Sequence, residues 1–367
     1  MTVSLCIIAY NEQNSLPSLM SDVLAQTYPH ELTEIVFVDS CSSDGTRDLF
    51  ESFSEKYKNE YLRIAVLDNP RKIQAAGWNT AISYAGGDVI IRVDAHASIP
   101  PQFIENNIKT IESGEYVCGG ARPSNISEPT PYREMLLLAE SSMFGSSIAS
   151  YRRQGNGKEY VSSLFHGAYR REVFGKVGGF NESLGRTEDN ELHWRIRQNG
   201  YKICKSDDII SYQNIRPTLF SMLRQKFANG KWIGLTLGVC PGCLSVFHFV
   251  PLCFVMAIIV CIALMVVGLS TGMSVFSLPI IGLGIMYAAA DLLMSVSAII
   301  SAKQFNGYML LLWLIFPMLH IIYGVGTITG LIYMPIWKSR LDGSAEREIE
   351  EVKKRIAEKT AKTEEIT

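Results

Sequence analysis

Three apolar runs near the end of the chain constrain its fold more than any other feature. They cover residues 244–269, 275–300 and 308–334, and each is longer than the roughly 20 residues that a helix needs to cross the hydrocarbon core of a bilayer. Inside lipid, a single run can satisfy its backbone hydrogen bonds only as a helix. The sequence therefore predicts a membrane region of about three apolar helices within residues 236–336.

The topology of this region is constrained by charge. Residues 217–232 mix aromatic and basic side chains, as in a helix that lies in the membrane interface. A cytoplasmic front half followed by three full spans would leave the tail outside, whereas Lys338 and Arg340 after the last run favour the inside. We therefore expect that one segment does not cross, with residues 308–334, broken by Pro317, or residues 233–244 as candidates.

The first 235 residues alternate between short apolar runs and amphipathic segments. The pattern predicts strands at 3–9, 34–38, 62–67 and 89–93 and a helix at 73–84. Strands that alternate with helices indicate an α/β fold with a doubly wound, Rossmann-like, largely parallel sheet. The start of the chain lacks the basic region of a signal peptide and is followed by a polar helix start, so we expect this part in the cytoplasm.

Composition excludes some classes of function. Lys and Arg number 34 against 36 Asp and Glu, so no general basic surface argues for nucleic acid. The eight cysteines lie partly inside strand-like and membrane-like runs, which suits a reducing compartment and predicts no disulfides.

An acid and an imidazole end the strand at residues 89–93. Asp94 and His96 lie one residue apart and face the same way, at the carboxyl end of a strand, where α/β sheets bind ligands. Both can bind a divalent cation, and a cation held by two side chains usually takes phosphate oxygens as further ligands. The pattern favours a nucleotide diphosphate site, although a solvated strand end is the simpler alternative.

Further acids mark two more positions. Asp39 ends the strand at 34–38, and Glu188 and Asp189 open a helix that stops at Asn199-Gly200. Such acids are often plain helix caps, but here they follow a glycine-rich loop. The loop-rich region 141–157 is either a cover for an acceptor or an ordinary insertion.

Taken together, these motifs resemble the family 2 glycosyltransferases, which have a GT-A fold and transfer sugar from a nucleotide donor with inversion. The resemblance covers roughly residues 3–235. The matching parts are residues 3–12 as the opening strand and loop, Val38-Asp39 with Ser43-Asp44-Gly45-Thr46, Gly87-Asp88 ahead of Asp94, and Glu188-Asp189 with Leu192, Arg195 and Gly200.

The resemblance implies a role for each site residue. Asp39 would bind the donor base, with Tyr10, Glu12 and Asp94 also on the nucleotide-sugar donor. Asp94 and His96 would bind the ribose and hold the metal of the diphosphate. Asp189 would deprotonate the acceptor hydroxyl as catalytic base. The acceptor side would include Gly167, Glu188, Gln225 and Trp232.

Three departures from the family pattern refine this prediction. His96 stands at the third position of the D-x-D motif, which predicts a preference for Mn²⁺ over Mg²⁺ because imidazole suits the softer ion. Trp78 replaces the usual arginine before Asn79. The Q-x-x-R-W signature of processive synthases is absent, because Gln225 lies too far from Trp232, so one sugar per acceptor is expected. The Asp-Ala-His-Ala form is similar to that of succinoglycan-type exopolysaccharide transferases.

The expected function is transfer of one sugar, by default from a UDP-sugar, to a polyprenyl-linked saccharide at the cytoplasmic face of the bacterial inner membrane, in exopolysaccharide, capsule or other surface-glycan synthesis. The alternatives are a polyprenyl-phosphate sugar synthase and a non-catalytic membrane scaffold. The expected parts are a cytoplasmic catalytic domain at 1–235, a multi-pass membrane region at 236–336 and a charged, solvated helical tail at 337–367, with apolar residues 349, 352 and 356 at helical spacing.

Overall fold

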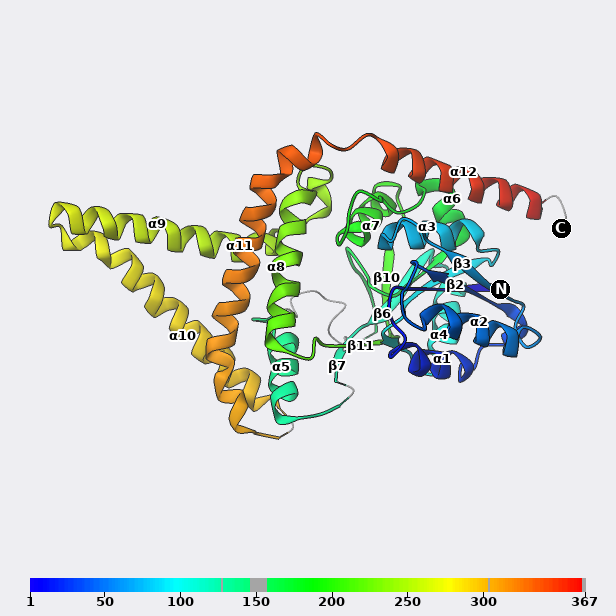
Figure 1. Ribbon diagram of the computed structural model, residues 1–367, viewed down its shortest axis with the longest axis horizontal. Coiled ribbons are helices and arrows are strands. Elements are labelled where there is room, and N and C mark those ends of the chain that lie inside the picture. Colours follow the sequence, from blue (N-terminus) through cyan, green and yellow to red (C-terminus); the bar gives the residue numbers. More distant parts are fainter. Residues whose placement is uncertain (127, 146–156, 303, 365–367) are drawn as a thin grey trace. The chain divides into compact units, whose positions relative to one another are not determined.

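A computed structural model describes residues 1–126, 128–145, 157–302 and 304–364 (Figure 1). The chain divides into two compact units that each combine separate stretches of sequence. The first contains Met1–Pro123, Ser150–Asn214 and Leu341–Thr367, and the second contains Ser124–Ala149 and Ile215–Arg340. Most of the loop for which we considered an acceptor cover, residues 146–156, lies outside the described residues.

The first unit is built around an eight-stranded sheet in the order β3-β2-β1-β4-β9-β6-β10-β8. Strands β3, β2, β1 and β4 are parallel, and β9 runs antiparallel between β4 and β6. The strands are β1 (Val3–Ala9), β2 (Thr33–Asp39), β3 (Arg63–Asp68), β4 (Val89–Asp94), β6 (Val117–Ala121), β8 (Lys158–Tyr160), β9 (Gly167–Arg170) and β10 (Ile203–Ile210). The predicted strands and the doubly wound α/β class are confirmed.

Helices cover both faces of this sheet, which explains why β1 and β2 are buried along their whole length. One core packs α1, α2 and α4 against the sheet, and the other packs α3, α6, α7 and α12. These helices are α1 (Leu16–Leu24), α2 (Thr46–Tyr57), α3 (Gln74–Tyr84), α4 (Phe103–Glu112), α6 (Arg171–Val177), α7 (Glu188–Gln198) and α12 (Ser344–Glu364). A small ladder pairs β5 (Ala97–Ser98) with β11 (Tyr212–Asn214).

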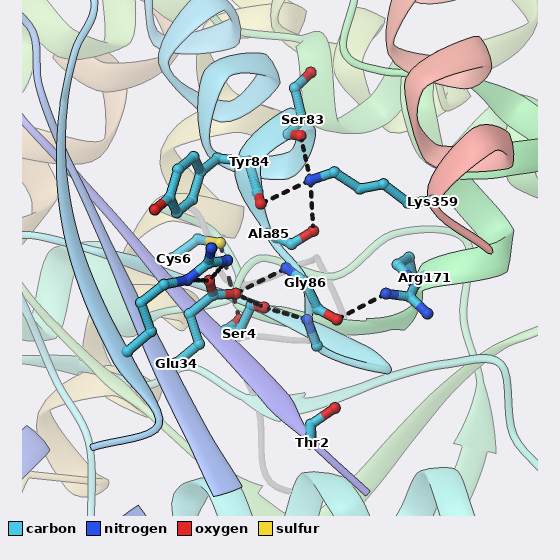
Figure 2. Close-up of polar contacts among 12 residues, drawn as sticks. Thr2, Ser4, Cys6, Glu34, Ser83, Tyr84, Ala85, Gly86, Arg171 and Lys359 are labelled. Atoms are coloured by element: carbon cyan, nitrogen blue, oxygen red, sulfur yellow. Dashed lines mark hydrogen bonds and ion pairs between the residues drawn. The ribbon is translucent and has the colours of Figure 1, made fainter. Parts of the chain in front are cut away.

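The C-terminal helix α12 is part of the first unit, so the expectation of a solvated tail is wrong. Val352 and Ile356 are 3% and 0% exposed, because their helical spacing forms an apolar stripe that packs into the same core as α3 and α6. Lys359 donates from Nζ to the carbonyl oxygens of Ser83, Tyr84 and Ala85 at 2.7, 2.7 and 3.2 Å (Figure 2). An ammonium group at the last carbonyls of α3 is favourable both as a hydrogen-bond donor and as a charge.

The turn that leads from α3 into β4 is held by a buried carboxylate. Glu34 accepts from the Gly86 amide at 2.8 Å and from the Ser4 hydroxyl at 2.5 Å (Figure 2). Arg63 forms an ion pair with the same carboxylate. Gly87 has no room for a side chain, because a Cβ would lie 2.6 Å from the Ser4 amide nitrogen. The start of β4, and therefore the position of its far end, is fixed by this cluster.

The second unit contains the apolar helices. Its elements are β7 (Ser124–Asn125), α5 (Pro131–Ser141), α8 (Leu219–Thr236), α9 (Val250–Thr271), α10 (Leu278–Ile300) and α11 (Leu312–Lys338). The three segments Val246–Thr271, Ser274–Ile300 and Gly307–Lys338 are long and apolar enough to cross a membrane. His320 shares hydrogen bonds with the Tyr287 hydroxyl at 2.8 Å and the Phe144 carbonyl at 2.6 Å, which supports a structural role for this polar residue.

Helix α8 packs along α11 through glycines on both helices. A Cβ at Gly230 would lie 2.1 Å from the Tyr323 carbonyl oxygen, and a Cβ at Gly326 would lie 2.3 Å from that of Phe227. The backbones therefore approach more closely than larger residues allow. On the other side of α8, Lys226 is buried and paired with Glu140 of α5 at 2.8 Å.

Candidate active site

The candidate site lies where the strand order of the parallel sheet reverses. β1 is central between β2 and β4, and the crevice beyond the carboxyl ends at such a switch point is the usual ligand site of doubly wound sheets. The loop after β1 and the turn after β4 meet there, because Nδ1 of His96 lies 3.1 Å from Oε1 of Glu12. The structure therefore brings together two of the predicted donor-side loops.

Asp94 is the last residue of β4 and is buried. Burial by itself disfavours its charge, but hydrogen bonding and charge from His166, with smaller contributions from His96 and Arg92, hold the pKa of Asp94 below its ordinary value. Its Oδ2 lies 3.8 Å from Nε2 of His166. Its Oδ1 has no hydrogen-bond partner within the described part of the chain, so an ionised and unsatisfied oxygen is available to a ligand.

His96 is oriented by two neighbours. Glu12 faces Nδ1, and the Gln213 side-chain nitrogen lies 3.0 Å from Nε2. A carboxylate on Nδ1 makes Nε2 the accepting nitrogen, as in metal-binding histidines; here Nε2 faces the Gln213 amide, which a cation at this nitrogen would displace. The donor set of Asp94 and His96 therefore fits a divalent cation. Among the described residues, no group of three His, Cys, Asp or Glu side chains could hold a metal ion by itself.

The loops after β1 and β2 are tied together. Asn11 donates its backbone amide to the Ser42 hydroxyl at 3.0 Å and accepts from the Ser43 amide at 2.8 Å. The Asp39 carboxylate accepts from the Ser42 amide at 3.2 Å, and Tyr10 beside this junction is 53% exposed. Asp39 and Tyr10 therefore border the same stretch of loop, as donor-binding residues would.

The two acids of the second motif open α7. Asp189 binds Nη1 of Arg92, which projects from β4 on the same face as Asp94. Burial of the Arg92 guanidinium opposes its charge, but the carboxylate of Asp189 holds the pKa of Arg92 above its ordinary value. Burial, and secondly the charge of Asp189, raise the pKa of Glu188 to about 8. The first unit therefore pairs Arg92 with Asp189, and burial favours the protonated form of Glu188.

Comparison with known proteins assigns the family of this domain. Residues 4–178 match the sequence model of Glycosyl transferase family 2. The chain carries a family 2 glycosyltransferase domain. Inversion at the transferred sugar is a general property of that family, and the predictions of family and enzyme class are confirmed.

The chain is also similar to two named relatives and to one solved structure. The chain is 28% identical over 237 residues to succinoglycan biosynthesis protein ExoA of Rhizobium meliloti, covering 63% of this chain and 68% of the relative. It is 35% identical over 123 residues to an undecaprenyl-phosphate 4-deoxy-4-formamido-L-arabinose transferase of Photorhabdus laumondii, covering 33% of this chain and 37% of that protein. It also resembles mannosyltransferase PcManGT of Pyrobaculum calidifontis, solved with GDP-Man and Mn²⁺, with a TM-score of 0.54 and 18% identity, covering 91% and 86% of the two chains. This last likeness shows a shared GT-A fold.

The remaining predicted site residues of the glycosyltransferase fall in two places. Gly167 begins β9 directly after His166, and a Cβ there would lie 2.7 Å from the Tyr169 hydroxyl. Gln225 and Trp232 lie on α8 in the second unit, where Trp232 packs edge-to-face against Trp337 with ring centroids 6.0 Å apart. Their role on the acceptor side stays a prediction.

The motifs alone did not identify three polar neighbours of the site. They are His166 beside Asp94, Gln213 beside His96 and Arg92 beside Asp189. Only Arg92 had a signal in the sequence, because it is the single charged residue inside the apolar run Val89–Asp94 before the terminal acid, and it shares the face of Asp94. The partners His166 and Gln213 depend on tertiary packing.

Proposed function

We propose that this protein transfers one sugar from a UDP-sugar to a polyprenyl-linked saccharide at the cytoplasmic face of a bacterial inner membrane, in the synthesis of a surface glycan. The observation that supports this most is the link between the donor-side and acceptor-side acids. Arg92 lies two residues before Asp94 on β4, and its guanidinium binds Asp189 on α7. This link supports the proposal that the two acids belong to one site, as a single displacement requires.

The residues of this site suit an inverting displacement. Asp189 would take the proton from the acceptor hydroxyl, which is otherwise a poor nucleophile, and such general-base assistance contributes about 10² to 10⁴ in rate. Asp94 and His96 would hold a divalent cation, which when bound would offset the charge that develops on the departing diphosphate. Attack from the face opposite the diphosphate converts an α-linked donor into a β-linked product.

A lipid-linked acceptor is supported by the apolar helices and by the relatives. The helices α9, α10 and α11 are long enough to anchor the enzyme in a bilayer, where a polyprenyl chain resides. One relative is named for succinoglycan biosynthesis and another for transfer to undecaprenyl phosphate. The second name supports the alternative that the acceptor is bare polyprenyl phosphate.

One experiment tests the enzyme and separates the two acceptors. Membranes that contain the full chain are incubated with a panel of nucleotide sugars and Mn²⁺, and release of nucleoside diphosphate is measured with lipid-linked oligosaccharide or with polyprenyl phosphate as acceptor. We expect release that depends on a UDP-sugar and on the oligosaccharide. Release with polyprenyl phosphate and not with the oligosaccharide would favour the polyprenyl-phosphate sugar synthase. If no combination of donor and acceptor gave more release than membranes that lack the protein, both activities would be excluded.

We further propose that α9 and α10 cross the membrane as a hairpin while α8 and α11 stay at the cytoplasmic surface. The chain leaves the catalytic unit after Asn214 and returns to it at Leu341, and α12 is packed into its core. Both ends of the membrane region therefore lie on one side, so the number of crossings is even. Helix α11 contains Pro317 and Pro335 and packs along α8. Each basic residue of α8 would cost about 2.5 to 3.5 kcal/mol at the bilayer centre.

Epitope insertion tests this topology in the intact protein. A short epitope is placed after Gly242, Gly272 or Phe305, or at the C-terminus, and its accessibility is compared in sealed cells and in permeabilised cells. We expect the Gly272 epitope alone to be accessible from outside. An external C-terminus would show three crossings, and an external Gly242 epitope would show that α8 crosses as well.

A further inference from the structure

Arg92 is a buried charged side chain to which the motif assignments give no role. It is 1% exposed and lies on the face of β4 that packs into the apolar core with Ile90. Taking a guanidinium out of water costs several kcal/mol unless it is well paired. A buried ion pair of this kind seldom adds net stability compared with apolar side chains of similar volume, so stability alone does not explain why a cation occupies this position.

The guanidinium lies over two aromatic rings. Its central carbon lies 4.6 Å from the centre of the Trp78 ring and 5.0 Å from that of the Phe180 ring, both within the range of cation–π attraction. Trp78 is the residue that replaces the arginine expected before Asn79. At this point of the fold, a tryptophan on α3 and a guanidinium from β4 pack together.

Further hydrogen bonds hold the residues around Arg92 in place. Asn79 donates to the Phe180 carbonyl at 2.9 Å and accepts from the Phe180 amide at 2.6 Å, which ties the Phe180 loop to α3. The Tyr169 hydroxyl interacts with Arg92 and shares a hydrogen bond of 2.8 Å with Nε2 of His193. Arg92 can therefore change its direction only if several buried groups also move.

The cation selects one of two adjacent acids. Arg92 binds the Asp189 carboxylate, whereas Oε2 of Glu188 has no hydrogen-bond partner in the described part of the chain. The charged and titratable groups that act on these acids include Arg92 and Asp94 from β4 and Tyr169 from β9. Among them Arg92 carries the positive charge, and its hydrogen bond goes to Asp189.

We propose that Arg92 is a positioning residue, which fixes the carboxylate of Asp189 in direction and thereby determines which of the two acids serves as the base. This role rests on the proposed function, since it requires that Asp189 accept the proton of the acceptor. A planar guanidinium held by two rings defines the orientation of a carboxylate more closely than a lysine ammonium does. An error of about 1 Å in such a group can cost about 10² in rate.

The test compares Arg92→Met and Arg92→Lys with the wild-type enzyme. Turnover is measured as nucleoside diphosphate release, and binding is measured separately with UDP and Mn²⁺ as the probe. We expect Arg92→Met to lose about 10² in turnover and Arg92→Lys to recover part of it, while both bind UDP within about threefold of wild type because the contacts of Arg92 are with Asp189 and two buried rings. Lys205→Met is the matched control, because Lys205 is a buried cation paired with Glu159 at 2.8 Å outside the site.

A double variant separates positioning from general damage to the fold. If Arg92 acts through Asp189, then Arg92→Met combined with Asp189→Asn is no slower than Asp189→Asn alone. The proposal would be overturned if the double variant lost turnover by the product of the two single losses. Full turnover in Arg92→Met would also overturn it. If Arg92→Met does not fold, the same comparison is made with Arg92→Lys. A wild-type enzyme that transfers no sugar overturns the proposed function, whereas an active wild type with multiplying losses overturns only the role of Arg92.

Discussion

Asp189→Asn is expected to lose sugar transfer by at least about 10²-fold while it still binds UDP with Mn²⁺. The amide has the shape of the carboxylate but cannot accept the proton of the acceptor hydroxyl, and general-base assistance is worth about 10² to 10⁴ in rate. Asp189 lies at the start of α7 and its partner is Arg92, whereas the donor-side residues follow β1, β2 and β4. The substitution should therefore lower kcat with little change in nucleotide affinity, which is measured by turnover assay and by titration calorimetry.

The adjacent acid supplies the matched control. Because the pKa of Glu188 is raised to about 8, its side chain is mostly protonated at pH 7, and glutamine mimics this neutral form. Glu188→Gln should keep turnover within about tenfold of wild type at pH 7. An equal loss in Glu188→Gln and Asp189→Asn would refute the assignment of Asp189 as the single base, and turnover near wild type in Asp189→Asn would remove it from the mechanism.

The free energy of unfolding of the free enzyme should depend on pH through the same carboxyl group, that of Glu188. A carboxyl group whose pKa is higher in the folded than in the unfolded state binds more protons when folded, so its contribution to stability is lost as pH rises from about 4.5 through about 8. Glu188→Gln removes this dependence. This sign distinguishes Glu188 from a paired carboxylate, whose contribution is lost as pH falls.

The sequence predicted those parts of the fold that depend on the local pattern of apolar and polar residues. The continuous apolar runs of β1 and β2 predict buried parallel strands, because such strands are covered on both faces. The acid at the end of β4 follows from the same rule, since ligands collect at the carboxyl ends of strands. Glu12 and His96 lie close together because the strands that precede them, β1 and β4, are neighbours in the sheet.

The parts that sequence did not predict depend on which surfaces meet. Residues 349, 352 and 356 gave the helical spacing of α12, but an amphipathic stripe does not say which surface it covers, and the structure buries it against α3 and α6. His166 carries no motif of its own. It reaches Asp94 because β9 inserts antiparallel beside β4, a pairing that no local pattern encodes.

Asp94→Asn is expected to reduce transfer by at least about 10²-fold and to raise the concentration of divalent cation required. The buried Oδ1 of Asp94 lacks a partner among the described residues, and an amide would offer it a neutral oxygen or an N–H group in place of an ionised ligand. The measurement is nucleoside diphosphate release over a titration of Mn²⁺ or Mg²⁺ after removal of metal by EDTA. Wild-type turnover that survives EDTA would contradict a metal-assisted reaction.

The identity of the preferred cation depends on His96. Imidazole nitrogen suits Mn²⁺ better than the harder Mg²⁺, and Glu12 on Nδ1 leaves Nε2 as the accepting nitrogen, from which a cation would displace the Gln213 amide. We therefore expect wild type to prefer Mn²⁺ and His96→Asp to shift the ratio of Mn²⁺ to Mg²⁺ activity toward Mg²⁺. His30→Gln is the control, because His30 stacks on Tyr61 with ring centroids 4.3 Å apart, outside the site. If His96→Asp and His30→Gln leave the same metal ratio as wild type, then His96 lines the pocket and Asp94 with the diphosphate holds the cation.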